Sequence, residues 1–403
     1  MDYVPAQTFL RDHSHRELFE KHGISVYPSA DGTDVSVNYD QIAAKKTDPM
    51  VQECRGLVLH LDSGVYSPDK PLGETHILSR PFKRFFNYGE GGPEHQFDLS
   101  NPNVRWEDKL DGTMISLFFN PWRESWQLST RSVPMADHKV SSLDGNDYTF
   151  RTLFEKTVGC ELNDWVNLFR GAGGFDTTHT YLFELTTPLN EIPRGVRQDK
   201  FSTTILGIRN TQTGEEYDPI PFAERNDINS PKIFNFGSLQ EALDYIHSQP
   251  PRHHEGMVAK LENRPCHYLR AKVKNASYVA ARHAAEGNVA SSTRSIMALI
   301  LSDSFDDVEP ILNTTLARVG REMQEKVGEY FRRQDSMYEA TVKPGMSRKE
   351  VAQACGKAGL NVTACFARYD GKTSNYRGWV ATRIQPSGWP HSVLDHLIDS
   401  CKG

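Results

Sequence analysis

The stretch WEDKLDGTMISLFF, residues Trp106–Phe119, joins a short charged segment to an apolar run that predicts a β-strand. Lys109 and Asp111 lie two residues apart, and residues with this spacing share one face of an extended chain. Gly112 follows directly and would let a backbone or a ligand approach closely. A solvated turn would explain the same residues. The stretch alone therefore leaves two interpretations of Lys109 open, a charge at a turn and a nucleophile beside an acid.

The length and composition of the chain limit the kinds of protein to consider. Its 403 residues are many for one compact core, so we expect two domains. The formal net charge of -6 argues against unspecific coating of nucleic acid but allows a local basic site. The six cysteines show no paired short spacing, so neither a zinc knuckle nor a disulfide scaffold is indicated. No apolar run could span a bilayer and no secretion signal is visible, which predicts a cytoplasmic protein.

Most of the chain has the pattern of a mixed α+β fold. From about Val35 to Val279, short period-two runs are separated by Gly, Pro and Asn clusters, which predicts mostly antiparallel sheet with interspersed helices. The longest of these helices is expected over residues 151–171.

The pattern changes to helix-like segments beyond about Ala280, with few strand signals. Two of these segments have start signals: Ser347 with Glu350 forms a capping box, and Ser392 with Asp395 has the same arrangement in weaker form. We therefore expect a domain boundary between about 280 and 291, with a smaller helical domain after it.

Two carboxylates and two lysines downstream of Lys109 are candidates for a shared site. Glu184 lies inside an apolar run, and an unpaired buried carboxylate is costly, so a cation or a hydrated metal is its expected partner. Glu255 precedes a glycine at the mouth of another predicted strand. Lys272 and Lys274 share one face of the next strand, although an exposed edge strand blunted by lysines has the same pattern. Extra cations near Lys109 would favour its neutral amine, the form that attacks an electrophile.

Three arginines add positive charge around this set. Arg55 precedes a glycine, Arg84 lies among the phenylalanines of SRPFKRFF, and Arg131 follows the strand after Lys109. Cations among aromatic residues can bind phosphates or RNA, but the aromatic residues could equally belong to the core.

Taken in order, these motifs resemble those of the covalent nucleotidyltransferases, which comprise polynucleotide ligases and capping enzymes. The chain is most similar to the bacteriophage RNA ligase 1 family, which repairs cleaved tRNA. The resemblance covers about Val35 to Asp307 and rests on ECRG, SRPFKRFFN, KLDGT, FELTTPLN, EGMVA and KVKNASYV. It implies an ATP-dependent ligase that joins RNA 3′-hydroxyl and 5′-phosphate ends through lysyl-AMP and RNA-adenylate intermediates, with Mg²⁺ or Mn²⁺.

The resemblance also implies a role for each matching residue. Lys109 would be the nucleophile, Lys272 and Lys274 would engage the α-phosphate, and Tyr278 would support ligation. The ATP phosphates, the ribose and the water shell of the metal would be bound by Arg55, Arg84, Arg131, Glu184 and Glu255. The pair Asp306 and Asp307 resembles an acidic pair that binds a divalent ion, and a charge cluster at a helix N-terminus explains it equally well.

The implied organisation is an adenylyltransferase domain over residues 1–285 and an all-helical domain over 286–403 that provides tRNA specificity. The implied partners are RNA, in particular tRNA with a broken anticodon loop, and an end-healing kinase-phosphatase; we expect a monomer. A DNA ligase or a capping guanylyltransferase would share the lysine chemistry, but these enzymes usually continue into a β-barrel where this chain continues into helices. A non-catalytic RNA-binding relative is the remaining alternative.

Overall fold

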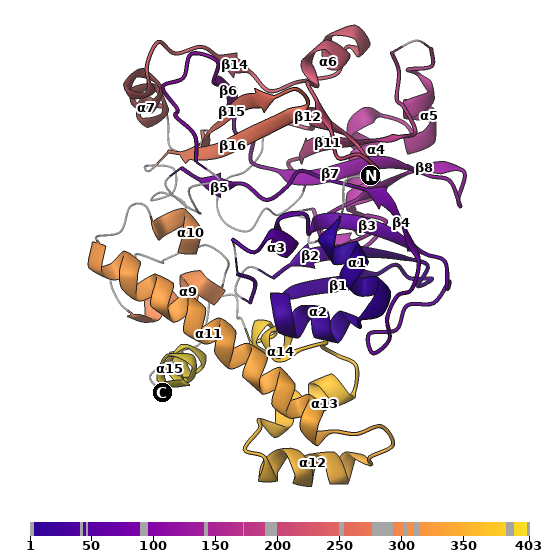
Figure 1. Cartoon of the computed structure of the whole chain (residues 1–403), viewed down its shortest axis with the longest axis vertical. Helices are drawn as coiled ribbons and strands as arrows, with labels where there is room; N and C mark the ends of the chain where they lie inside the picture. Colours follow the sequence, from indigo (N-terminus) through magenta and orange to yellow (C-terminus); the bar gives the residue numbers. More distant parts are fainter. Residues whose placement is uncertain are drawn as a thin grey trace. The chain divides into compact units, whose positions relative to one another are not determined.

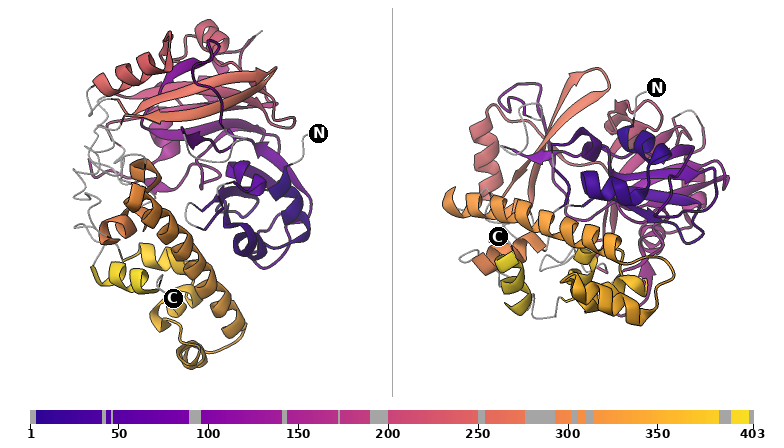
Figure 2. Two further views of the ribbon diagram at one scale, coloured as in Figure 1. Left: turned by 60° about the vertical axis from the view of Figure 1, so that its left-hand side comes forward. Right: turned by 60° about the horizontal axis from the view of Figure 1, so that its bottom comes forward.

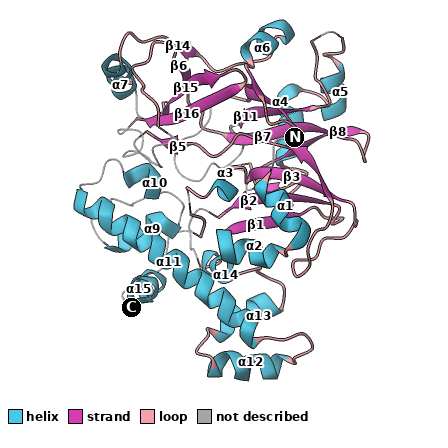
Figure 3. Cartoon of the chain, viewed as in Figure 1, coloured by secondary structure: helices cyan, strands magenta, loops and turns pink. Residues whose placement is uncertain are grey.

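The computed structural model (Figure 1) describes residues 4–40, 43–45, 47–88, 96–140, 144–171, 173–189, 200–249, 254–275, 293–301, 305–309, 314–383 and 391–400. The chain forms two compact units. Unit 1 consists of Met1–Tyr39 and Lys45–Glu286, and unit 2 consists of Asp40–Ala44 and Gly287–Gly403. Figure 3 shows strands in unit 1, and the described residues of unit 2 contain helices and no strand.

The first sheet of unit 1 has the strand order β1-β2-β3-β4, and all its neighbours pair antiparallel. Its strands are β1 (Ile24–Pro28), β2 (Asp34–Tyr39), β3 (Arg55–Leu61) and β4 (Thr75–Ser79). The helices in this part of the chain are α1 (Pro5–Asp12), α2 (His15–His22) and α3 (Pro49–Gln52). The sequence determines both ends of α2, because Ser14 and Glu17 form a capping box and Gly23 ends the helix with φ +65°.

The second sheet has the order β13-β12-β11-β7-β8 and is antiparallel throughout. Its strands are β7 (Thr113–Asn120), β8 (Ser125–Ser129), β11 (His179–Thr186), β12 (Ser202–Asn210) and β13 (Glu216–Tyr217). A short hairpin, β9 (Lys139–Val140) with β10 (Tyr148–Thr149), lies between β8 and β11 in sequence. Three helices, α4 (Phe150–Val158), α5 (Leu162–Asn167) and α6 (Ile220–Asn226), contribute to the apolar core on this sheet.

The third sheet has the order β14-β6-β15-β16-β5. Its strands are β5 (Phe86–Asn87), β6 (Arg105–Asp108), β14 (Ile233–Phe234), β15 (Gly256–Arg264) and β16 (His267–Lys274), and only the pair β5 and β16 is parallel. Helix α7 (Leu239–Ser248) packs against it through Ala242 and Ile246, and Figure 2 shows this helix alongside the long β15–β16 hairpin. The predicted antiparallel α+β pattern of this part of the chain is confirmed.

A buried ion cluster at Glu53 stabilises the start of β3. The Glu53 carboxylate lies 3.2 Å from Arg80 and 3.1 Å from Arg209, and both arginine side chains are almost fully buried. Lys83 reaches the same carboxylate at 3.2 Å from a more exposed position. These cations lower the pKa of Glu53 to about 2 even though burial acts in the opposite direction.

The prediction of a single helix over residues 151–171 is wrong. The structure has two helices there, α4 and α5, because Gly159 adopts φ +83° and ends α4 with a left-handed cap. The apolar period continues on both sides of the break, since both helices bury residues in the same core.

The described helices of unit 2 are α9 (Thr293–Leu301), α10 (Phe305–Val308), α11 (Thr314–Thr341), α12 (Arg348–Lys357), α13 (Val362–Tyr369), α14 (Tyr376–Ala381) and α15 (His391–Ser400). The capping box of Ser347 and Glu350 is confirmed at the start of α12. The cap predicted at Ser392 is wrong, because α15 already begins at His391 and Asp395 pairs with Arg294. No described helix combines the length and the apolar character needed to cross a membrane.

Candidate active site

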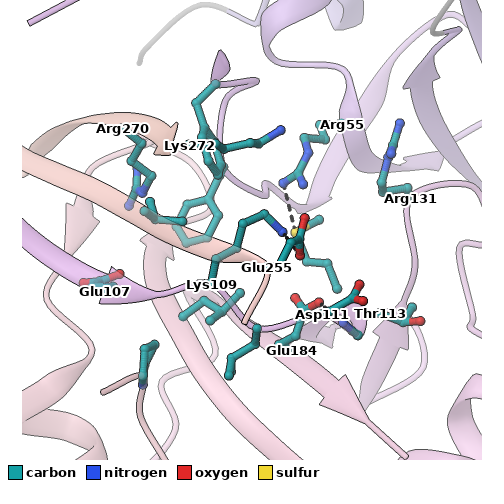
Figure 4. Close-up of a pocket in the computed structure, with 18 of the residues that line it drawn as sticks. Arg55, Glu107, Lys109, Asp111, Thr113, Arg131, Glu184, Glu255, Arg270 and Lys272 are labelled. Atoms are coloured by element: carbon teal, nitrogen blue, oxygen red, sulfur yellow. Dashed lines mark hydrogen bonds and ion pairs between the residues drawn. The ribbon is translucent and has the colours of Figure 1, made fainter. Parts of the chain in front are cut away.

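A cavity of about 450 Å³ lies in unit 1 and gathers residues from all three sheets (Figure 4). It is lined by most of the residues that the sequence singled out, namely Lys109, Glu184, Glu255, Lys272, Lys274, Arg55 and Arg131. Lys109 follows β6 directly, and its backbone N–H donates to the carbonyl of Gly256 at 3.0 Å. The nucleophile candidate is therefore fixed by the edge where β6 pairs with β15, and it is not on a solvated turn.

Glu255 lies between two lysines. Its Oε2 is 2.5 Å from Lys109 Nζ, and its Oε1 is 3.6 Å from Lys274 Nζ. Burial favours the neutral amine of Lys109, but the attraction of Glu255 outweighs it and raises the pKa of Lys109. This differs from the expectation that downstream lysines keep Lys109 neutral, because a carboxylate lies between the cations.

Glu184 reaches the cavity from β11. The backbone N–H of Gly112 donates to its Oε1 at 2.9 Å, yet burial raises the pKa of Glu184 to about 7. Gly112 allows this approach, because a Cβ at this position would lie 2.4 Å from the carbonyl oxygen of Leu185. The close approach predicted for Gly112 is thus to the backbone of β11.

Two arginines and a lysine extend the positive charge of the cavity. Arg55 Nη1 donates to the sulfur of Met114 at 3.1 Å, and burial lowers the pKa of Arg55. Its guanidinium lies 5.6 Å from the ring centroid of Phe85, and Lys272 Nζ lies 5.0 Å from the same ring. Arg131 also lines the cavity. These cations suit a polyanionic ligand such as a triphosphate.

Arg84 is not among the cavity-lining residues. It is 7% exposed, and its guanidinium lies 4.5 Å from the ring centroid of Tyr39 and 5.2 Å from that of Phe86. Its Nε and Nη1 make no hydrogen bond within the part of the chain that the structure describes. The basic-aromatic run therefore contributes Phe82 and Phe85 to the cavity, whereas Arg84 lies buried beside aromatic rings.

Three predicted residues remain, namely Tyr278, Asp306 and Asp307. Tyr278 is outside the described residues. Asp306 lies on α10 in unit 2, where Gln324 Nε2 donates to it at 3.3 Å. The side chain of Asp307 is outside the described part.

Sequence reasoning missed several cavity residues. Glu107, Arg270 and Val258 line the cavity. Period-two spacing could have identified the two charged residues. Glu107 lies two residues before Lys109, and Arg270 lies two residues before Lys272. Each therefore shares a strand face with a residue that the sequence analysis selected.

The carboxylates of the cavity provide some, but not all, of the oxygen ligands that a bound Mg²⁺ or Mn²⁺ ion would need. Glu184 and Glu255 present carboxylates to one cavity, and oxygen ligands suit Mg²⁺ and Mn²⁺. No group of three or more His, Cys, Asp or Glu side chains that could hold a metal ion occurs among the described residues. A cation bound here would need further ligands from a phosphate or from water.

Residues 53–278, more than half of the chain, match the model of a protein family described as RNA ligase. The chain belongs to the RNA ligase family. The chain is also 29% identical over 238 residues to a protein of Autographa californica nuclear polyhedrosis virus whose name proposes a bifunctional polynucleotide kinase/RNA ligase. The match covers 56% of this chain and 30% of the viral protein, so the chain spans less than a third of that relative.

Solved structures are similar to this chain at low identity. An archaeal ATP-dependent RNA ligase has 13% identity and a TM-score of 0.46, over 100% of this chain and 99% of the other. A variant of a Naegleria gruberi RNA ligase, solved with ATP and Mn, has 11% identity and a TM-score of 0.32, over 45% of this chain and 52% of the other. At these TM-scores the likeness does not establish a shared fold.

Proposed function

We propose that this chain is an ATP-dependent RNA ligase and that Lys109 is its nucleophile. The observation that carries the proposal is the position of Lys109 Nζ, 2.5 Å from Glu255 in a cavity that also contains Glu184 and Lys274. A nucleotidyl transfer requires a nucleophile, cations for the phosphates and carboxylates for a metal within one enclosed site. Membership of the RNA ligase family supports RNA as the acceptor.

The reaction would have three steps. Lys109 Nζ attacks the α-phosphorus of ATP; an N–P bond forms, the bond to the bridging oxygen breaks, pyrophosphate leaves and the amine loses a proton. An oxygen of an RNA 5′-phosphate then attacks the phosphorus of lysyl-AMP; the N–P bond breaks, the lysine amine regains a proton, and a 5′-5′ pyrophosphate links AMP to the RNA. An RNA 3′-hydroxyl attacks that end and releases AMP. Activation is needed because a phosphate monoester has no good leaving group.

Different cations of the cavity would bind different phosphate groups of ATP. Lys272 and Lys274 would stabilise the charge that develops on the α-phosphate, because their strand ends beside Lys109. Arg55 and Arg131 would bind the outer phosphates.

A divalent cation, Mg²⁺ or Mn²⁺, would be held by Glu184 and Glu255 together with the triphosphate and water. When bound, it would neutralise phosphate charge. The ribose would hydrogen-bond to the same carboxylates. Asp306 and Asp307 are proposed as a second divalent site in unit 2.

The natural substrate proposed is tRNA with a broken anticodon loop. We assign tRNA specificity to residues 286–403 and the adenylyltransferase activity to residues 1–285, in a monomer. The viral relative's name combines a kinase with a ligase, which supports an end-healing partner for this chain.

Covalent labelling tests the proposal. The protein is incubated with Mg²⁺ and α-labelled ATP, GTP or NAD, and we expect label from ATP alone. Lys109→Ala abolishes the label, whereas Lys21→Ala, a change at a half-exposed lysine of α2, leaves it unchanged. Label from GTP, or none from any nucleotide, contradicts the proposal. The AMP-loaded protein is then offered 5′-phosphorylated RNA and DNA strands, and transfer to DNA alone would exclude an RNA ligase.

A further inference from the structure

A short segment of unit 2 lies within the sequence of unit 1. Residues Asp40–Ala44 belong to unit 2, whereas Tyr39 before them and Lys45 after them belong to unit 1. Tyr39 is the last residue of β2, so unit 2 includes the residues that directly follow this strand. The chain therefore joins the end of β2 covalently to unit 2.

Asp40 fixes this segment within unit 2. Its side chain is 7% exposed, and a buried carboxylate is costly unless it is paired. Arg377 on α14 pairs with its Oδ2, and the backbone N–H of Ala43 donates to its Oδ1 at 2.9 Å. Arg332 on α11 donates from Nη1 to the carbonyl of Ala43 at 2.7 Å. Two helices of unit 2 therefore hold the segment through charged side chains.

The end of β2 contacts Arg131, one of the cations that line the cavity. The hydroxyl of Ser36 donates to the backbone carbonyl of Arg131 at 3.0 Å, and Arg131 Nε donates to Asn38 Oδ1 at 3.5 Å. The ring centroid of Tyr39 lies 5.2 Å from the same guanidinium. These three residues of β2 limit the positions that the Arg131 side chain can take.

Tyr39 is tightly packed where β2 ends. It is 5% exposed, and its backbone N–H donates to the carbonyl of Cys54 at 2.8 Å. Its ring centroid also lies 4.5 Å from the guanidinium of Arg84. In a close-packed interior, a shift of one side chain displaces its neighbours. A shift of Tyr39 would therefore displace Arg131, which Figure 4 shows among the residues that line the cavity.

We propose that Asp40 and Arg377 are positioning residues for ATP binding, because they hold the end of β2 and, through it, Arg131. This inference rests on the proposed function, since it concerns the ATP that Lys109 would attack. It goes beyond the assignment of tRNA specificity to unit 2, because unit 2 would also contribute to the binding of ATP in unit 1.

The physical reason is preorganisation of Arg131. An arginine side chain has many rotamers, and ordering them costs free energy when a ligand binds. The contacts with β2 order this side chain before ATP arrives, and loss of the Asp40 ion pair would leave part of that ordering to ATP. The reacting α-phosphate would meet Lys109, Lys272 and Lys274 instead. The rate at saturating ATP should therefore not depend on Asp40.

The test measures the Kd of α,β-methylene-ATP by calorimetry, and the KM and saturating rate of covalent labelling by ATP, both with Mg²⁺. The analogue has a carbon in place of the bridging oxygen, so it binds without reacting. The variants are Arg377→Met, Arg377→Lys, Arg131→Met and the double variant of Arg131→Met with Arg377→Met. Arg294→Met is the matched control, because Arg294 on α9 also forms an ion pair in unit 2, with Asp395 at 2.6 Å. Urea unfolding checks that each variant is folded.

We expect Arg377→Met to raise both the Kd and the KM by about fivefold, at the lower end of the coupling between linked sites, while the saturating rate is kept. Arg377→Lys should show a smaller rise, since it keeps the charge but not the planar guanidinium. In the Arg131→Met background, Arg377→Met should have no further effect, because its action passes through Arg131. Arg294→Met should leave the Kd and the KM unchanged.

A folded Arg377→Met with the wild-type Kd and KM overturns the inference, while label from ATP still supports the proposed function. An effect of Arg377→Met that is equally large in the Arg131→Met background overturns it too. If Arg377→Met does not fold, the same comparison is made with Asp40→Asn, which removes the charge but keeps an oxygen. A wild type that binds the analogue but accepts no label contradicts the proposed function alone, since the Kd comparison still decides the inference. A wild type that does neither overturns both proposals.

Discussion

Lys109 and Glu255 form an ion pair of 2.5 Å although 146 residues separate them in the sequence. The pair raises the pKa of Lys109, so the ligand-free site holds the proposed nucleophile as an ammonium ion. Loss of that proton is therefore part of the activation that the first step requires.

The variant Lys109→Arg distinguishes the contribution of the ion pair to stability from the proposed role of Lys109 as the nucleophile. A guanidinium keeps the charge opposite Glu255 but cannot attack phosphorus at neutral pH. We expect a urea midpoint close to that of the wild type, together with complete loss of covalent label from ATP. An arginine variant that still accepts AMP would show that another residue is the nucleophile.

Lys274→Met should slow the formation of lysyl-AMP by about 100-fold, because it removes one of the cavity cations proposed to stabilise the α-phosphate. Lys274→Arg should lose less, since the charge remains. Single-turnover labelling at saturating ATP measures both. Equal rates for Lys274→Met and the wild type would remove Lys274 from the proposed mechanism.

Gly112→Ala should destabilise the fold by about 1–3 kcal/mol, because the new Cβ would lie 2.4 Å from the carbonyl oxygen of Leu185. Gly356→Ala, inside α12, is the matched control. Its Cβ would meet nothing closer than 3.9 Å, so a gain of about 0.5–1 kcal/mol is expected. Urea unfolding measures the change in the free energy of unfolding of both variants. An unchanged free energy of unfolding in Gly112→Ala would mean that β7 and β11 can separate at this point.

Glu53 should make the free energy of unfolding depend on pH in the acidic range. Its pKa falls from 4.5 to about 2 on folding, so its stabilisation is present above pH 4.5 and is lost as the pH falls through 2. The stability lost over that range is about 3 kcal/mol. Glu53→Gln should unfold more easily at pH 7, since it leaves Arg80 and Arg209 without their carboxylate, and should lose less stability in acid. The measurement is urea unfolding from pH 2 to 7, and parallel pH curves would contradict the assignment.

Local spacing made much of this site predictable. Lys272 and Lys274 lie two apart, and the structure places both on β16 and in the cavity. The apolar run after Gly112 is β7. Such features depend only on near neighbours in the chain.

Features that depend on tertiary contacts could not be read in the same way. The pairing of Glu255 with Lys109 arises from the meeting of β6 with β15, which no local pattern encodes. Arg84 has the sequence context of a phosphate ligand, yet Tyr39 packs against its guanidinium. The break at Gly159 shows the opposite case, since the glycine was visible in the sequence but the apolar period continued across it.

The hydrogen bond from Lys109 N–H to the carbonyl of Gly256 has a consequence for how the chain can vary. Met257 lies opposite Asp108, so strand register determines where the ammonium of the next residue points. A slip of one residue would turn Lys109 to the other face of the sheet and leave Glu255 facing its neighbour. An insertion between Trp106 and Lys109 should therefore abolish covalent labelling by ATP even though every side chain proposed for the reaction is still present.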